Sequence, residues 1–239
     1  MFSFIYHDLI FNPLYNGLIF LMDVFPWMDA GVAVIIFTII VRLILFPLSK
    51  KSIITQVRMK EIEPELAKIR QKTGDDRQAQ ALQTMALYKE KGISPFSSFF
   101  LLFLQLPIVY ALYSIFIHSG LPKVDETLLY SFVAIPSVNM HFLGFVDISV
   151  RNIAMSVIAS VSQFLQLHFS PATRTIKTVS NSNNPADIAQ NMTKNMKYFF
   201  PIMVFLISYK ISSVVALYWT VTSLFTLAQE IYVRKFHIR

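Results

Sequence analysis

The chain contains no cysteine among its 239 residues. This absence excludes disulfide bonds, thiolate metal sites, cysteine nucleophiles and a lipid anchor on an N-terminal cysteine. The five histidines are scattered, and none has a metal-ligand spacing with another or a neighbouring acid and nucleophile. We therefore expect no enzyme active site, no bound metal and no cofactor.

Charged residues are also scarce, at 15% of the chain against about a quarter in ordinary soluble domains, while 54% of residues are hydrophobic. The apolar residues fall in four long blocks, at 31–48, 96–117, 152–169 and 198–233. A membrane-spanning helix needs about 17–25 apolar residues, so each of the first three blocks predicts one span. The last block would be roughly 54 Å long as one helix. It must fold back on itself, with the hairpin predicted at 210–213 and a short fourth span before it. The sequence therefore predicts an all-α membrane protein with a bundle of five transmembrane helices.

Positive charges are distributed unevenly between the predicted loops. Ten Lys or Arg residues lie in 49–93, four in 170–197 and three in 234–239, whereas Lys123, Arg151 and Lys210 are the three on the opposite side. The first 41 residues contain none. Cytoplasmic loops are enriched in Lys and Arg, so we expect the N-terminus outside and the C-terminus in the cytoplasm. The net charge of +7 then reflects these loops and predicts no specific nucleic-acid sequence as a partner.

These features divide the chain into ten predicted segments. They are an extracytoplasmic amphipathic segment (1–29), transmembrane helix 1 (30–48), a cytoplasmic helical hairpin (49–93), transmembrane helix 2 (94–117), an extracytoplasmic loop (118–150), transmembrane helix 3 (151–169), a cytoplasmic loop (170–197), transmembrane helices 4 (198–210) and 5 (211–233), and a basic cytoplasmic tail (234–239).

The N-terminal segment and the hairpin each have two interpretations. In the first segment Asn12 predicts a helix cap with Pro13 at the first helical position, and the helix then lies on the outer membrane surface or is an uncleaved signal-like segment. Its predicted apolar face comprises Leu14, Leu18, Leu21, Met22 and Phe25. In the second, Ile62, Leu66 and Ile69 share a helical face, 73–76 predicts a turn and a cap, and a further helix is expected over about 77–90. The alternative for this basic segment is a solvated connector.

Arg42 lies within the first apolar block, where a charge costs at least about 2.5–3.5 kcal/mol on insertion scales. It precedes Lys50 by eight residues, or roughly 12 Å of helix. Three arrangements are open: a buried functional arginine, a side chain that extends to the cytoplasmic interface, or an ion pair with Glu230.

Polar side chains also recur at helical spacing in the other spans. They either join helices by hydrogen bonds or, together with Arg42, line a wet cationic cavity. The short fourth span favours local thinning of the bilayer. The stripes are Ser98 and Gln105; Ser156, Ser160 and Gln163, with Ser162 and Gln166 beside them; and Trp219, Thr222, Ser223, Thr226 and Glu230.

Several motifs, in order along nearly the whole chain, resemble those of the YidC-type membrane protein insertases (the YidC/Oxa/Alb family). They are residues 31–49 with Arg42 and Pro47, Met85-Ala86-Leu87-Tyr88-Lys89, Gln105-Leu106-Pro107-Ile108 with Ala111-Leu112-Tyr113, Phe142-Leu143-Gly144-Phe145, Gln166 before Ser170-Pro171, and Leu217-Tyr218-Trp219 through Gln229. The chain departs from the family pattern at Ser97-Ser98-Phe99-Phe100 and at Ser212-Ser213-Val214. It resembles the compact form of the family.

The resemblance implies a membrane protein insertase and chaperone in the bacterial plasma membrane, acting on nascent membrane proteins alone or with a translocon. It implies a five-helix bundle whose hydrophilic groove opens to the cytoplasm and to lipid. Arg42 would attract polar or acidic segments of the substrate, with Gln105, Gln166 and Trp219 beside it and with Gln163 and Thr38 also in the groove. By analogy, the hairpin would receive a ribosome, a targeting receptor or the Sec translocon. Its predicted recruitment residues are Arg58, Lys60, Lys68, Arg70 and Arg77.

Two other classes of function remain open from the residues. Arg42 could be the anion site of a small-solute transporter, although no repeated halves with broken helices are visible. The chain could also be a structural scaffold subunit of a membrane complex, in which case the charge at Arg42 is dispensable.

Overall fold

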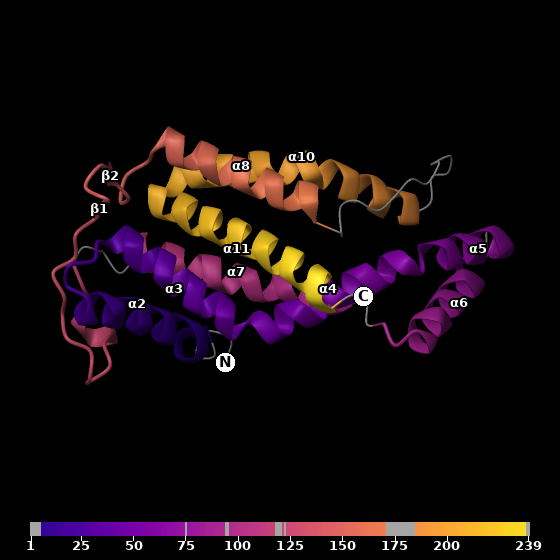
Figure 1. Ribbon diagram of the computed structural model, residues 1–239, viewed down its shortest axis with the longest axis horizontal. Helices are drawn as coiled ribbons and strands as arrows, with labels where there is room; N and C mark the ends of the chain where they lie inside the picture. Colours follow the sequence, from indigo (N-terminus) through magenta and orange to yellow (C-terminus); the bar gives the residue numbers. More distant parts are fainter. Residues whose placement is uncertain are drawn as a thin grey trace.

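The computed structural model describes residues 6–74, 76–93, 96–117, 121, 123–170 and 185–237, with side chains left aside at 96–104, 117, 185–196 and 237. This part of the chain is mostly helical, with one two-stranded antiparallel sheet. Figure 1 shows an elongated bundle in which one helical pair projects from one end and a long connection covers the other.

The elements follow one another in the order of the predicted apolar blocks. They are the π-helix η1 (His7–Phe11), α2 (Asn12–Val24), α3 (Ala30–Ile44), α4 (Phe46–Glu61), α5 (Glu63–Thr73), α6 (Arg77–Glu90), α7 (Phe96–Ile117), the 3-10 helix η2 (Glu126–Leu128), β1 (His141–Phe142), β2 (Val146–Asp147), α8 (Ile153–Phe169), α10 (Pro185–Ile211) and α11 (Ser213–His237).

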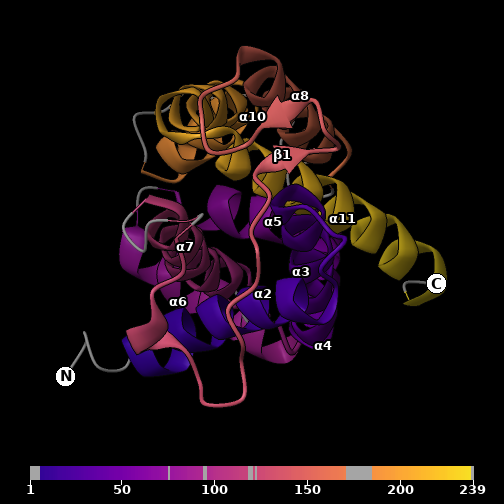
Figure 2. The same cartoon turned by 90° about the vertical axis from the view of Figure 1, so that its left-hand side faces the viewer.

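Helix α11 is the centre of the bundle. It packs against α8 and α10 on one side and against α3 and α4 on the other (Figures 1 and 2). Helix α2 lies on the outer side of α3 and also contacts α7. The main apolar core runs through all these elements, because each long helix is apolar over much of its circumference and therefore buries area on several neighbours.

Helices α3 and α4 meet at a bend of 65°. Pro47 stands at the start of α4, where it lacks the N–H that would bond to the carbonyl of residue 43 and where its ring would clash with that carbonyl in a straight helix. The first span predicted at 30–48 is therefore not one continuous helix. The chain changes direction at Leu45, and α4 continues through the predicted boundary at residue 49 as far as Glu61.

The N-terminal helix differs from its prediction in two respects. Asn12 does not cap it, because η1 leads directly into α2 and the cap residue Phe11 has helical backbone angles. The buried residues of α2 are Tyr15, Asn16, Leu18, Ile19 and Met22, whereas Phe25 is exposed. This helix therefore packs its strongest apolar face on the bundle, and a polar residue, Asn16, is part of that face.

Helices α5 and α6 form the antiparallel pair that projects from the bundle (Figure 1). Helix α6 begins and ends at the predicted residues, and the Asp76 carboxylate accepts a hydrogen bond from the Ala79 N–H at 2.9 Å. Ile62, Leu87 and Ile93 are buried in a small separate core, with Leu66 and Ile69 packed against it. The expected apolar face of the first helix is thus confirmed.

Residues 123–150, for which the sequence analysis gave no conformation, form an ordered strap across the end of the bundle opposite α5 and α6 (Figures 1 and 2). The Ala30 N–H donates to the Asn139 carbonyl at 2.8 Å, and the Ser213 N–H donates to the Val150 carbonyl at 2.9 Å. The Asn16 side chain donates to the Leu128 carbonyl at 2.9 Å. The strap therefore joins α2, α3 and the start of α11.

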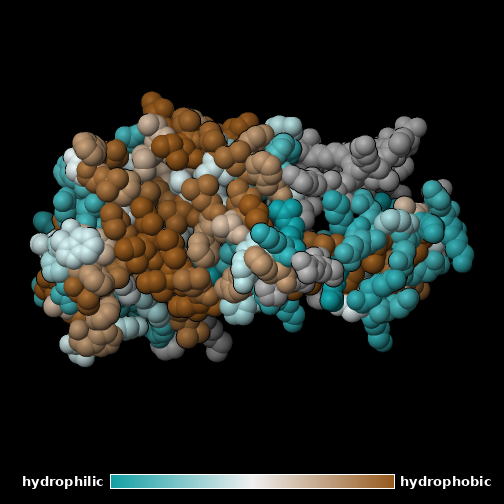
Figure 3. Space-filling view, in the orientation of Figure 1, coloured by the Kyte–Doolittle hydropathy of each residue, from teal (hydrophilic) through white to brown (hydrophobic). Residues whose placement is uncertain are grey.

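In the described part of the chain, Ser213–Phe236 is long and apolar enough to cross a membrane, and the bent pair α3–α4 passes the same test as one unit. Gln105–Phe116 and Ile153–Phe169 are shorter apolar helices. Figure 3 shows a broad hydrophobic surface over the bundle and a hydrophilic surface over α5 and α6. The count of five spans and their limits remain predictions.

Two predicted limits, the hairpin at 210–213 and the start of the fourth span at 198, can be compared with the ends of the helices. The turn near residue 212 separates α10 from α11 at the predicted hairpin, but α10 begins at Pro185, well before the fourth span predicted at 198. A helix and its membrane-spanning part need not coincide, since the amino acids that precede the apolar block can continue the same helix into water. Residues 171–184 of the predicted cytoplasmic loop 170–197 and the side chains of 97–100 lie outside the described residues, and 185–197 belong to α10.

Candidate functional site

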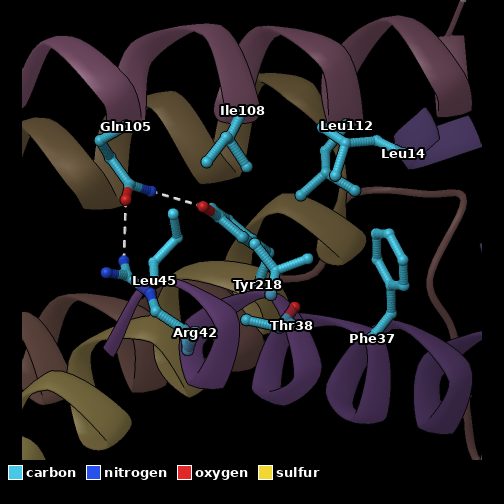
Figure 4. Close-up of a pocket in the computed structure, with 10 residues that line it drawn as sticks. Leu14, Phe37, Thr38, Arg42, Leu45, Gln105, Ile108, Leu112 and Tyr218 are labelled. Atoms are coloured by element: carbon cyan, nitrogen blue, oxygen red, sulfur yellow. Dashed lines mark hydrogen bonds between the residues drawn. The ribbon is translucent and has the colours of Figure 1, made fainter. Parts of the chain in front are cut away.

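A polar cluster of three side chains from three helices lies between α3, α7 and α11 (Figure 4). One terminal nitrogen of Arg42, Nη2, donates a hydrogen bond to Gln105 Oε1 at 2.8 Å. The amide nitrogen of Gln105 donates in turn to the hydroxyl of Tyr218. Gln105 therefore uses both ends of its amide, and it holds the arginine and the tyrosine in fixed positions.

This cluster lines a narrow pocket with room for about one water molecule. Thr38 also lines it, but the threonine hydroxyl donates to the Val34 carbonyl of its own helix at 2.6 Å. The rest of the lining is apolar and consists of Leu14, Phe37, Val41, Leu45, Ile108 and Leu112. The pocket is thus an apolar space with one positive charge at its edge.

The bonds of Arg42 decide between the three arrangements open from the sequence. Its guanidinium points across to α7 and not along α3 toward the end of that helix predicted to be cytoplasmic (Figure 4). The ion pair with Glu230 is wrong, because Glu230 Oε1 accepts a bond from Ser170 Oγ at 3.0 Å, and the ion pair recorded among the described residues joins Lys91 to Glu65. Arg42 is half-buried, and the Gln105 amide and the Tyr218 hydroxyl to which it is bonded are neutral.

A second polar cluster lies between α8 and α11, away from the Arg42 pocket. Gln163 donates to Gln166 Oε1 at 2.6 Å and accepts from Ser223 Oγ at 3.0 Å. In addition, Ser160 Oγ donates to the Pro201 carbonyl at 2.9 Å. Gln163 and Ser223 are buried, so these residues join helices by hydrogen bonds, which was the other interpretation of the polar stripes.

The six predicted groove residues therefore do not share one site. Arg42, Gln105 and Thr38 line one pocket, whereas Gln163 and Gln166 belong to the second cluster. Trp219 is 8% exposed and packs in the main core.

Tyr218 is the pocket residue that the sequence analysis did not select. It lies four residues before Thr222, which was assigned to a polar stripe, and residues four apart share a helical face. That spacing places the Tyr218 hydroxyl on the same polar face as Thr222 and could have identified it from the sequence. The neighbouring Trp219 was chosen in its place from the family resemblance.

The predicted recruitment residues lie on α4, α5 and α6, on or near the hydrophilic end shown in Figure 3. Arg58, Lys60, Lys68 and Arg77 are exposed, and Arg70 is half-buried. Within the described ranges, no three His, Cys, Asp or Glu side chains are grouped in a way that could hold a metal ion.

The fold and this site define a helical membrane protein, whose apolar bundle holds a small polar site built around one arginine. The sequence model of the family described as "60Kd inner membrane protein" matches residues 20–239. The chain belongs to this family.

Curated relatives agree with this assignment. The chain is 33% identical to the "Membrane protein insertase YidC" of Fusobacterium nucleatum subsp. nucleatum, over 95% of this chain and 97% of the relative. It is 32% identical to the protein of the same name from Clostridium tetani, over 88% of this chain and 84% of the relative. The relative from Anaeromyxobacter dehalogenans (strain 2CP-C) is longer: 30% identity extends over 90% of this chain but 35% of that protein.

Proposed function

We propose that this chain is a membrane protein insertase of the bacterial inner membrane and that the Arg42 pocket receives polar segments of the incoming protein. The observation that carries the proposal is the position of Arg42. Its positive charge faces a pocket between apolar helices, and its side-chain partners are neutral groups, the Gln105 amide and the Tyr218 hydroxyl. Family membership and the names of the full-length relatives support the insertase class over a transporter or a scaffold.

The chemistry of the pocket suits transient binding. A guanidinium carries five N–H donors, so after the bond to Gln105 it retains donors for a carboxylate or a backbone carbonyl of the substrate. In a site of low dielectric constant such a bond is stronger than in water. Gln105 keeps the guanidinium oriented while its remaining donors bind the substrate group. No covalent step and no nucleotide are required.

The apolar segment of the substrate then leaves the pocket sideways, because burial of its own apolar surface in lipid is favourable. In this proposal five segments span the bilayer, the first of them bent after Ile44, with the N-terminus outside and the C-terminus in the cytoplasm. The α5–α6 pair then lies in the cytoplasm. Its exposed Arg and Lys side chains support docking of a ribosome, a targeting receptor or the Sec translocon.

The test is complementation of bacterial cells depleted of their own insertase. The chain is expressed unchanged or as Arg42→Ala, Arg42→Lys or Arg42→Glu, and the insertion of a single-span substrate with an acidic outer tail is scored. The matched control is Arg151→Ala, which removes an exposed arginine outside the pocket. Protein level in the membrane is measured for every variant.

We expect rescue by the unchanged chain, by Arg42→Lys and by Arg151→Ala, and loss of rescue by Arg42→Ala and Arg42→Glu. Equal rescue by all three Arg42 variants would leave insertion in place and remove the role of Arg42. Failure of the unchanged chain at a normal membrane level would favour the transporter or scaffold class.

A further inference from the structure

The strap across the end of the bundle has an unusual composition for a connection outside a membrane. Residues 127–146 contain no Asp, Glu, Lys or Arg. Despite this, Phe132 is 69% exposed and Phe145 is 90% exposed, and Ile135 and Leu143 are also exposed. An exposed apolar surface of this kind marks a contact with a partner or a membrane.

Aromatic side chains of the neighbouring N-terminal segment extend this surface. Phe20 of α2 contacts Phe132 edge to face, with ring centres 6.2 Å apart, and Tyr130 lies 5.6 Å from Phe132. Trp27, in the turn between α2 and α3, is 79% exposed. We call these four residues and Phe145 the aromatic rim.

The rim is held in place by buried polar groups. Asn16 is 2% exposed, and its side chain donates to the Leu128 carbonyl and accepts from the Tyr130 N–H at 2.6 Å. Near the other end of the strap, Asp29 Oδ2 accepts from the Leu143 N–H at 3.0 Å. Leu143 has a φ of +50°, a backbone conformation that a leucine rarely adopts without such support. The exposure of these rings is therefore a property of the folded strap.

The chemistry of the rim restricts what can cover it. The strap is largely non-helical, and such a backbone does not occur in the hydrocarbon core against lipid, because its N–H and carbonyl groups would lack partners. Aromatic side chains beside polar backbone suit the boundary between headgroups and acyl chains, where Trp and Tyr are enriched. The rim also lies at the end of the hydrophobic surface opposite the hydrophilic α5–α6 pair (Figures 1 and 3).

We infer that the aromatic rim is a docking surface for the headgroup–acyl boundary of the outer leaflet. Since the strap segment at 127–146 has no Asp, Glu, Lys or Arg and its one histidine is His141, neutral phospholipid is sufficient. The rim fixes the depth of the strap and, through Asp29 and the start of α3, the depth of Arg42. The inference rests on the proposed membrane embedding but not on the role of Arg42.

The chain contains two tryptophans, Trp27 and Trp219, and this makes the test direct. In Trp219→Phe the fluorescence reports on Trp27 alone, and in Trp27→Phe it reports on the buried Trp219. Each variant is reconstituted into phosphatidylcholine vesicles with bromine atoms near the headgroup or at the methyl end of the acyl chains. Acrylamide serves as the quencher in water. Insertion of a substrate by the same vesicles is measured separately, so that failure of the insertase function is distinguishable from failure of the rim.

We expect shallow bromines to quench Trp27 several-fold more than deep bromines and more than acrylamide does, without a requirement for anionic lipid. Quenching mainly by acrylamide would place Trp27 in water and overturn the inference. Protection from all three quenchers would assign the rim to a protein partner or a second copy of the chain, which also overturns it.

A second reporter tests the strap itself. Phe132→Trp and Glu126→Trp are each made in the background lacking both native tryptophans; Glu126 is an exposed, charged residue just before the uncharged segment. We expect shallow quenching of the tryptophan at 132 and acrylamide quenching of the one at 126. Equal lipid quenching at both positions would contradict a surface specific to the aromatic residues.

Discussion

The contact between Gly31 and Phe142 predicts how much an alanine at residue 31 destabilises the protein. Gly31 is buried near the start of α3, and Phe142 of β1 packs directly over it. A Cβ atom at residue 31 would lie 2.7 Å from Phe142 Cγ and 2.9 Å from Phe142 Cβ. The Cβ of Phe142 is fixed by its backbone, so no rotation of the side chain relieves that contact and the strap must shift.

Overpacking of this kind costs about 1–3 kcal/mol. An alanine also gains about 0.5–1 kcal/mol over glycine in a helix. We therefore expect Gly31→Ala to lower the free energy of unfolding by up to about 2.5 kcal/mol, the largest difference between the two effects. Denaturant unfolding in lipid–detergent bicelles, followed by the tertiary circular dichroism signal, measures it.

The matched control is Gly17→Ala. Its Cβ would lie 2.8 Å from Cε2 of Phe37, at the far end of a ring that can swing away, so we expect little loss or a small gain. In a Phe142→Ala background, Gly31→Ala should become neutral or stabilising, because the two residues are in contact and their effects do not add. An equal loss in both backgrounds would refute the reasoning.

Three further predictions concern the hairpin, the helix bend and the polar cluster. Leu87→Ala, which opens the small core of the α5–α6 pair, should lower the free energy of unfolding by about 2 kcal/mol or more and speed hydrogen exchange there. Glu65→Gln, which breaks the exposed pair with Lys91, should lower it by under about 1 kcal/mol. A larger loss for Glu65→Gln than for Leu87→Ala would contradict this prediction. Pro47→Ala restores a backbone donor and should open the 65° bend, so spin labels at Ile40 and Lys51 should move apart; an unchanged distance would assign the bend to packing. Tyr218→Phe removes the acceptor of Gln105 and should slow substrate insertion in proteoliposomes about two- to tenfold, since a neutral hydrogen bond contributes about 0.5–1.5 kcal/mol; an effect no larger than that of Tyr209→Phe would exclude this role.

Two features set by local sequence, the start of α6 and the buried face of α5, were predicted correctly, whereas the predicted cap at Asn12 was wrong. Asp76 and the turn before it define the start of α6, because a capping carboxylate and the N–H three residues later are neighbours in the chain. The buried positions of α5 follow in the same way from helical spacing. Both features could be predicted without knowledge of any distant contact.

Features set by distant contacts could not be predicted. The strap is ordered by bonds from Asn16 to Leu128 and Tyr130, whose sequence separations are 112 and 114 residues. Helical spacing likewise assigned Gln163 and Gln105 to polar faces, but it does not say which helix each face meets. The structure places Gln163 against Ser223 and Gln105 against Arg42, and this choice of partners separates one polar cluster from the other.

Helix α3 links the two ends of the bundle. At its start, Asp29 accepts from the Val32 N–H as a helix cap and from the Leu143 N–H of the strap, while Gly31 lies under Phe142. Arg42 follows eleven residues after Gly31, or roughly 16 Å along the helix axis. A helix of this length transmits a displacement at one end to the other nearly as a rigid body. The strap contacts and the Arg42–Gln105 bond therefore act on one helix. A substitution in the strap that breaks its contacts with α3 should shift Arg42, although the substituted residue does not line the pocket.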